Sequence, residues 1–224
     1  APTRIGKTWS LARAALIDAA LKPNESIGLI APAYHKTKYI MSHIGDCLTK
    51  SPALAQMTDL DVKAGDIERL KKEVSKHKIT FKNKSYIEVL TADVQGQGFA
   101  MMGRGYKKVF VDESPEIPDE AYSKILRMLG ESEDAMLFEI GNPWFVGDHF
   151  HKHFQDPFWN KIHISWQTCV KEGRLTKEYI EEMKQELTSM EFKVLYEAQF
   201  PTESEYGIFR NDWLIEASKK PPTD

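Results

Sequence analysis

Cysteine is scarce in this sequence, and it has no long hydrophobic runs. Its two cysteines, Cys47 and Cys169, are far apart and lack the close spacing of metal ligands. They are typical of reduced thiols in a cytosol-like compartment. The sequence shows no signal peptide and no apolar segment long enough to span a bilayer, so we expect no membrane partner.

The sequence also has no large excess of positive or negative charge. The formal net charge of -3 at pH 7 argues against a globally basic nucleic-acid binder. Any contact with nucleic acid must then be local, or come from several assembled copies. With 224 residues, of which 42% are hydrophobic and 28% charged, the chain has the composition of a globular protein. One large α/β domain is the default expectation.

The first eight residues, Ala1–Thr8, carry the clearest chemical signal. They form a phosphate-binding loop of the pattern G-x-x-x-x-G-K-[ST], with alanine in the place of the first glycine. Gly6 lets backbone N–H groups and the next helix N-terminus approach a polyphosphate. Lys7 is predicted to neutralise the outer phosphates, and the Thr8 hydroxyl to bind Mg²⁺. Nucleotide contacts are predicted at Pro2, Thr3, Arg4, Ile5, Gly6, Lys7 and Thr8.

Strands and helices alternate after this loop, which implies parallel βαβ units. Helices are expected from residue 8 to about 21, around residues 40–48, at 66–76, from 118 to about 129, and from about 176 and 188. Buried strands are expected at residues 26–31, 107–111, 135–140 and 162–166, and a hairpin at 78–82 and 86–90. The strand that feeds the phosphate loop would lie before residue 1. Residues 95–105 form a glycine-rich loop that does not match the dinucleotide pattern G-x-G-x-x-G.

Two adjacent carboxylates, Asp112 and Glu113, directly follow the apolar strand at residues 107–111. Ligands of open α/β sheets bind at the carboxyl ends of the strands. Asp112 is predicted to hold Mg²⁺ together with Thr8. Glu113 is predicted to orient the water that attacks the γ-phosphate. Two solvated acids at a strand end are the alternative, which the phosphate loop and the βαβ order make the weaker one.

Gly141, Asn142 and Pro143 follow the next strand. Asn142 is a candidate sensor of the γ-phosphate, because its amide can bond a phosphate or the attacking water. All three residue types also favour ordinary turns, and the sequence leaves the two interpretations about even.

Several motifs together resemble the large terminase subunit, the DNA-packaging ATPase of tailed phages. They are the loop with Arg4 inside it, Ala31–Tyr34, the hairpin at Phe81–Tyr86, Gly103–Gly105 shortly before Asp112, Gly141–Pro143, and Met190–Phe200 with Tyr206–Phe209. The resemblance spans nearly the whole chain. It implies a three-layer P-loop NTPase fold of the additional-strand catalytic-glutamate (ASCE) type, with a mainly parallel sheet. Residues 1–200 would form the ATPase domain, and residues 201–224 its closing segment and the start of a linker.

The resemblance also implies roles and partners. Catalytic residues would be Glu113, Lys7, Arg4 in cis and Arg104 as an arginine finger for a neighbour, since arginine suits phosphate oxygens. Gly141–Pro143 would be the coupling motif. The cofactors would be ATP and Mg²⁺. The partners would be double-stranded DNA, a portal protein, a small terminase subunit and copies of the chain, which would be monomeric in isolation and a ring when active. The location would be the cytoplasm of an infected bacterium, transiently on the procapsid portal.

Two other functions stay open from the sequence. A helicase-type translocase would need a second motor domain, for which 224 residues leave no room. A non-catalytic nucleotide-binding regulator would not need Lys7, Thr8, Asp112 and Glu113 together. The histidines His149, His151 and His153 lack the spacing of a metal motif. The basic segment 69–84 fits a solvated surface better than a DNA contact.

Overall fold

The computed structural model describes residues 1–60, 77–92, 101, 103–130 and 132–202. The chain divides into two compact units, residues 6–141 and residues 1–5 with 142–224, and each is described by itself. Among the described residues, no helix has both the length and the apolar character needed to cross a membrane. The helix expected at 66–76 and the segment Tyr206–Phe209 lie outside the described residues, as do parts of the glycine-rich loop and of the basic segment.

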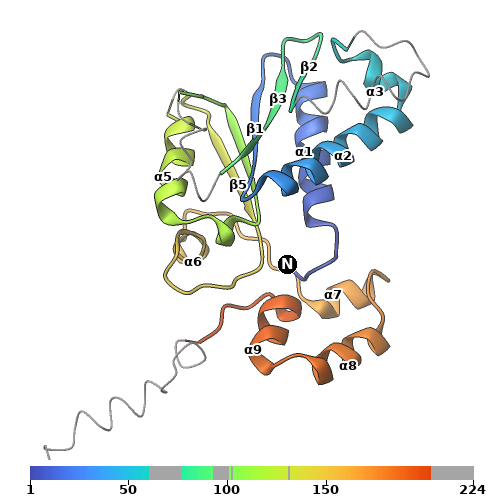
Figure 1. Ribbon diagram of the computed structural model, residues 1–224, viewed down its shortest axis with the longest axis vertical. Helices are drawn as coiled ribbons and strands as arrows, with labels where there is room; N and C mark the ends of the chain where they lie inside the picture. The colour runs from blue at the N-terminus through green and yellow to red at the C-terminus, as the bar shows by residue number, and fades with distance from the viewer. Residues whose placement is uncertain (61–76, 93–100, 102, 131, 203–224) are drawn as a thin grey trace, which may run out of the picture. The chain divides into compact units, whose positions relative to one another are not determined.

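A five-stranded sheet forms the centre of residues 6–141 (Figure 1). Its order is β2-β3-β1-β4-β5. The strands are β1 (Ser26–Ala31), β2 (Lys78–Thr80), β3 (Tyr86–Thr91), β4 (Lys108–Asp112) and β5 (Met136–Ile140). Four of them run parallel, and β2 pairs antiparallel with β3. The predicted parallel sheet and the predicted hairpin are thus confirmed.

Helices cover both faces of this sheet, which gives the predicted three layers (Figure 1). The helices are α1 (Lys7–Leu21), α2 (Tyr34–Lys50), α3 (Pro52–Gln56) and α5 (Asp119–Met128). Successive residues of a strand point to opposite faces. Leu29 accordingly packs with α1 and α2, whereas Ile30 packs with Ile125 of α5. Burial on both faces explains why β1 and β4 have continuous apolar sequences.

The strand β5 differs from its prediction as a buried strand. It lies at one edge of the described sheet, and Met136 and Phe138 are 49% and 44% exposed. Phe138 stacks on Phe110 of β4, with 4.6 Å between ring centroids. A short apolar run predicts a strand, but it does not tell a central strand from an edge strand.

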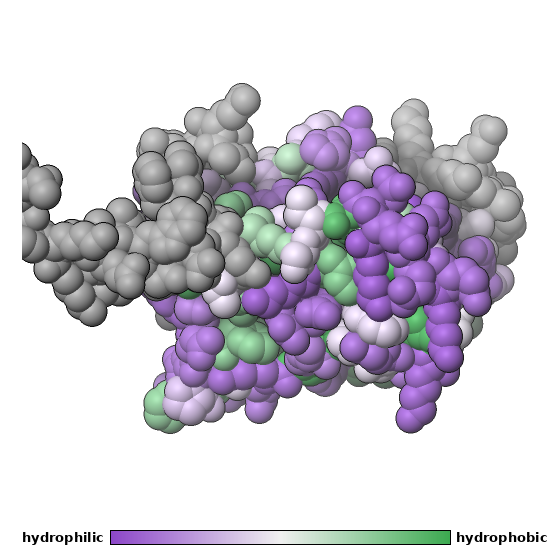
Figure 2. Space-filling model, turned by 90° about the horizontal axis from the view of Figure 1, so that it is seen from below, coloured by the Kyte–Doolittle hydropathy of each residue, from purple (hydrophilic) through white to green (hydrophobic). Residues whose placement is uncertain are grey.

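Figure 2 shows one face of the molecule coloured by hydropathy. On the visible part of that face, hydrophobic residues form small areas separated by hydrophilic ones. Scattered exposed apolar residues are normal for folded proteins.

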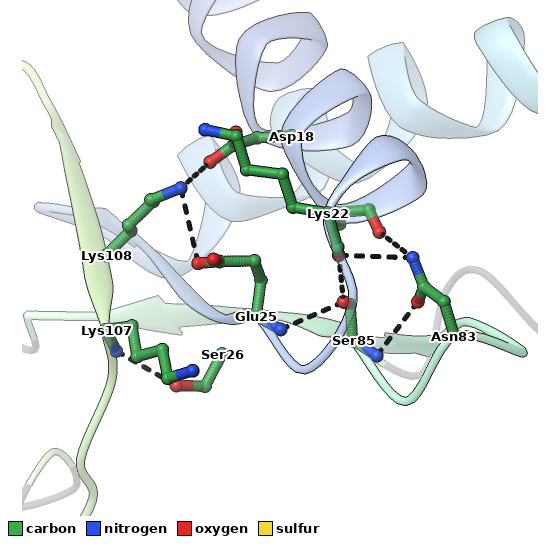
Figure 3. Close-up of polar contacts among 9 residues, drawn as sticks. Asp18, Lys22, Glu25, Ser26, Asn83, Ser85, Lys107 and Lys108 are labelled. Atoms are coloured by element: carbon green, nitrogen blue, oxygen red, sulfur yellow. Dashed lines mark hydrogen bonds and ion pairs between the residues drawn. The ribbon is translucent and has the colours of Figure 1, made fainter.

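A buried cluster of charges lies where β4 begins (Figure 3). Lys108 is 6% exposed, and its ammonium group contacts Asp18 near the end of α1 and Glu25 just before β1. Nearby, Asn83 donates to backbone carbonyls at the end of α1, and Ser85 donates to the carbonyl of Lys22. The cluster joins α1, β1, the β2–β3 turn and β4 at the amino edge of the sheet.

The second unit is helical among its described residues. Its helices are α6 (His149–Gln155), α7 (Trp166–Lys171), α8 (Lys177–Glu186), α9 (Ser189–Phe192) and a π-helix (Lys193–Glu197). Thr188 and Glu191 form a capping box at the start of α9. The predicted strand at 162–166 is wrong. Residues 162–165 are in no strand, and Trp166 begins α7, so this apolar stretch belongs to a helix start.

Candidate nucleotide site

The phosphate loop leads directly into α1. Gly6 precedes the helix with φ 89° and ψ 33°, a left-handed conformation in which glycine carries no steric cost. Lys7 is the first residue of α1, and the N–H of Ser10 donates to the carbonyl of Gly6. The predicted phosphate loop is therefore followed at once by a helix. The N-terminus of a helix offers N–H groups and a favourable dipole to an anion.

Thr8 and Asp112 are joined by a hydrogen bond at the carboxyl edge of the sheet. The Thr8 hydroxyl donates to Oδ2 of Asp112 at 2.7 Å. Asp112 is 2% exposed, and its other oxygen, Oδ1, is buried with no hydrogen-bond partner among the described residues. Burial raises the pKa of Asp112, although the Thr8 hydrogen bond and the charges of Lys36 and Lys7 oppose this. One carboxylate oxygen is thus held by α1, and the other is available to a further group.

Lys7 lies beside the second carboxylate of the pair. Its Nζ is 3.9 Å from Oε1 of Glu113, and the lysine is 8% exposed. Burial lowers the pKa of Lys7, and the negative charges of Glu113 and Asp112 do not fully oppose the shift. Burial likewise raises the pKa of Glu113 against the effect of Lys7. The site therefore brings together the predicted lysine and both predicted carboxylates.

The backbone of Glu113 is strained. Its φ of 48° and ψ of 49° are left-handed, which costs a residue with a side chain about 1 kcal/mol or more. Such conformations persist where the surrounding structure holds them, and they gather at functional sites. Glu113 caps a short 3₁₀ turn, Ser114–Glu116, whose Glu116 N–H donates to the Glu113 carbonyl at 2.9 Å.

Two residues near this turn were not predicted. Lys36, in the first turn of α2, places its Nζ 2.7 Å from both carboxylate oxygens of Glu116. The charge of Lys36 also acts on Asp112 and Glu113, where it opposes the burial that raises their pKa values. A weak signal was present in the sequence, because Lys36 follows the end of a buried strand by five residues.

The end of β5 also contacts the Glu113 turn. A Cβ atom on Gly141 would lie 2.4 Å from Cδ of Pro115, so glycine is needed for this close approach. Ser114 donates to Oε1 of Glu139 on β5 at 2.6 Å. These contacts place the first residue of the predicted coupling motif against the turn that carries Glu113. Asn142 and Pro143 are buried, and they belong to the second unit.

The start of the phosphate loop belongs to the second unit as well. There Pro2 is buried, Arg4 is exposed, and the Thr3 N–H donates to the carbonyl of Leu195 in the π-helix at 2.8 Å. Burial and a hydrogen bond with Tyr179 raise the pKa of Tyr196, and the charge of Arg4 opposes this. The predicted nucleotide contacts of Pro2, Thr3, Arg4 and Ile5 stay predictions.

Arg104 forms its ion pair with Glu88, which is not one of the predicted site residues. Its guanidinium forms an ion pair with Glu88 of β3, which also accepts the hydroxyl of Tyr106 at 2.8 Å. Glu88 of β3 and Val109 of β4 both pair with Gly28 of β1, so they lie at the same level of the sheet. Val109 comes three residues before Asp112 on β4. At about 3.3 Å per residue, this separation is about 10 Å along the sheet. In this structure Arg104 does not complete the Lys7–Glu113 site of its own chain.

The three histidines of α6 do not form a metal site. His149 is buried, and the rings of His149 and His153 lie edge to face with 6.3 Å between centroids. His153 stacks on Trp159. Across the described ranges, no group of three or more histidine, cysteine, aspartate or glutamate side chains is placed to hold a metal ion.

Comparisons with known proteins give the chain a family. The family model for the terminase large subunit, T4likevirus-type, N-terminal, matches residues 1–215. The search of curated proteins found no match. Among solved structures, the ATPase domain of the Thermus phage P74-26 large terminase is 15% identical, with a TM-score of 0.66 over 89% of this chain and 86% of that one.

Two further structures are of whole large terminases. The HK97 bacteriophage enzyme is 16% identical, with a TM-score of 0.64 over 89% of this chain and 45% of that one. The enzyme of a thermophilic bacteriophage, solved in complex with ATP-γ-S, is 13% identical, with a TM-score of 0.62 over 89% of this chain and 46% of that one. At these sequence identities the solved structures show only that the fold is shared. The family assignment rests on the match to the family model. The chain belongs to the terminase large subunit family, and it corresponds to the N-terminal part of that family's proteins.

Proposed function

We propose that this domain hydrolyses ATP at the site formed by Gly6, Lys7, Thr8, Asp112 and Glu113. The observation that carries the proposal is the buried lysine beside two carboxylates at the start of α1. Burial disfavours the charged forms of all three groups, so an incoming polyanion with its counter-ion would stabilise the site. The solved relative with bound ATP-γ-S supports a nucleoside triphosphate as the ligand.

The residues fit a magnesium ion. Thr8 and Asp112 supply hydroxyl and carboxylate oxygens, the ligands that Mg²⁺ prefers, and the buried Oδ1 of Asp112 has no partner among the described residues. When bound, Mg²⁺ would neutralise charge on the β- and γ-phosphates. Thr8 and Asp112 are the residues that would hold it.

The chain's own groups divide the reaction between them. The N–H groups at the start of α1 and the Lys7 ammonium would bind phosphate oxygens and stabilise the charge that develops on them. Glu113 would orient a water molecule toward the γ-phosphorus. The bond between that phosphorus and the β–γ bridging oxygen would break, with ADP and phosphate as products. Arg4, two residues before Gly6, would add a second cation in cis.

We further propose that Arg104 serves a neighbouring subunit. Its ion-pair partner Glu88 lies about 10 Å along the sheet from the level of Asp112 in its own chain, which favours action on another copy. To act there it would have to leave Glu88. A ring of copies bound to a portal protein, acting with a small terminase subunit on double-stranded DNA, would use Gly141–Pro143 to couple hydrolysis to movement. Residues 1–200 would form the motor domain.

The test is the Mg²⁺-dependent ATPase rate of the full-length protein against its concentration. Glu113→Gln should lower kcat by about 10³-fold, since the attacking water loses its carboxylate. Arg104→Ala should remove a rate that rises faster than linearly with concentration. Arg174→Ala, at an exposed arginine of the second unit, is the matched control. Full activity in Glu113→Gln would refute the proposed site, and a linear rate indifferent to Arg104 would refute the finger.

A further inference from the structure

The turn after Glu113 has to hold a strained residue in place. Glu113 itself is left-handed, and the Glu116 N–H closes the turn onto the Glu113 carbonyl at 2.9 Å. A left-handed glutamate returns to a relaxed conformation unless its neighbours prevent it. The contacts that fix residues 114–116 therefore also fix where the Glu113 carboxylate points.

One side of the turn is held by β5. Ser114 donates to Glu139, and Pro115 packs against Gly141 so closely that no Cβ fits between them. Glu139 lies in β5, the strand next to β4 in the sheet, and Gly141 follows directly after it. Neither of them reaches the last residue of the turn, Glu116.

The other side of the turn is held by α2. Lys36 contacts both carboxylate oxygens of Glu116 at 2.7 Å, across a separation of 80 residues in the chain. The lysine side chain is only one quarter exposed, whereas Glu116 is more exposed. Since two equally short contacts define the position of a carboxylate better than one, this pair ties the end of the turn to the start of α2.

We propose that Lys36 is a positioning residue for ATP hydrolysis, which through Glu116 fixes the turn that presents Glu113. The inference rests on the proposed function of Glu113. Lys36 touches neither the nucleotide nor the reacting water in this role. An error of about 1 Å in the position of a catalytic group can lower a rate about 100-fold, so a modest contact can matter for turnover.

A purely structural ion pair predicts a different result. Partly exposed pairs contribute little to folding stability, and their loss leaves both stability and turnover nearly unchanged. A positioning pair, by contrast, changes kcat without a matching change in stability or in ATP binding. The two roles are therefore separated by measuring kcat, KM and the urea midpoint on the same variants.

The experiment uses the full-length protein with Lys36→Met, Lys36→Arg, Glu116→Gln and the double variant Lys36→Met/Glu116→Gln. We expect Lys36→Met to lower kcat about tenfold, with KM for ATP and the urea midpoint unchanged, and Lys36→Arg to recover most of the loss. The double variant should be no slower than the slower single variant, because the two residues act as one unit. Lys38→Met is the matched control, since Lys38 is an exposed lysine on the same helix.

Three outcomes would overturn the inference. They are an unchanged kcat in Lys36→Met, a raised KM alone, which would mean that Lys36 binds the nucleotide itself, and losses that multiply in the double variant. A failure of the proposed function would look different. The wild-type protein would then not hydrolyse ATP, or Glu113→Gln would remain fully active.

Discussion

Two buried lysines stand at opposite edges of the same sheet, and their surroundings differ. Lys7, at the carboxyl edge, is 8% exposed with its Nζ 3.9 Å from Glu113. Lys108, at the amino edge, is 6% exposed and contacts Asp18 directly and Glu25 at 3.2 Å (Figure 3). Burial lowers the pKa of Lys7. Burial alone would also lower the pKa of Lys108, but its contacts with the carboxylates of Asp18 and Glu25 outweigh burial and raise that pKa.

The difference separates the proposed nucleotide site from a structural cluster. At the amino edge, the chain itself supplies the negative charge that Lys108 needs, so the charged lysine stabilises the fold. At the carboxyl edge, burial outweighs the carboxylates and lowers the pKa of Lys7, so the site favours the arrival of further negative charge. Buried charges that a fold does not fully compensate are typical of functional sites.

The largest expected effect is the loss of turnover in Lys7→Met. The substitution keeps an unbranched side chain of similar size but removes the cation that is proposed to face the phosphates. We expect kcat to fall about 10³-fold, equivalent to about 4 kcal/mol of transition-state stabilisation. The free energy of unfolding without nucleotide should stay the same or rise, because a lysine with a lowered pKa opposes folding wherever it is charged. Steady-state ATPase assays and urea unfolding measure the two quantities, and a marked loss of stability would contradict the comparison.

Lys108→Met should show the opposite pattern. Removing the cation leaves Asp18 with Lys22 as its remaining ion pair and takes the Lys108 contact from Glu25, which should lower the free energy of unfolding by about 3 kcal/mol. The folded fraction should keep its ATPase activity. Lys22→Met is the control, because Lys22 also pairs with Asp18 but is 58% exposed, and its loss should cost about 0.5 kcal/mol at most. Equal losses in the two variants would show that burial does not matter here.

A smaller, pH-dependent effect is expected for Asp18→Asn. Burial alone would raise the pKa of Asp18, but hydrogen bonds from Lys108 and Lys22 lower it below its ordinary value of about 3.9. A carboxylate with a lowered pKa stabilises the fold above the unfolded value and loses this effect as the pH falls through the folded value. Asp18→Asn should therefore cost about 1.5 kcal/mol at pH 7, and progressively less below about pH 4. Urea unfolding between pH 7 and pH 3 tests this, and a constant difference would contradict it.

Local patterns in the sequence predicted much of the fold and part of the site. The apolar runs of β1 and β4 predicted strands correctly, because both faces of these strands are buried. One rule predicted that four of the candidate site residues lie close together, namely Lys7, Thr8, Asp112 and Glu113. The rule is that a phosphate loop and the carboxyl ends of parallel strands meet at the same edge of a sheet. The stretch 162–166 was wrong as a strand, because short apolar segments also occur where helices begin.

Contacts between distant charged residues were not predictable in the same way. Lys108 and Asp18 are 90 positions apart, and a lysine before an apolar strand suggests an ordinary exposed strand start. Lys36 and Glu116 belong to charged stretches that resemble solvated surfaces. Their partners are set by the register of the sheet and by the strained turn at Glu113, and neither is visible in a single sequence.

The most direct test of the comparison is the stabilisation of Lys7→Met and Lys108→Met by ATP-γ-S with Mg²⁺. Urea unfolding would be measured with and without the nucleotide at 100 times its wild-type Kd, where binding adds about 2.7 kcal/mol. We expect Lys108→Met to start less stable than the wild type and to gain the same increment. Lys7→Met should start near the wild type or above it and gain almost nothing. If the nucleotide stabilised Lys7→Met fully and Lys108→Met not at all, the proposal that the nucleotide binds at the carboxyl edge and not at the amino edge would be contradicted.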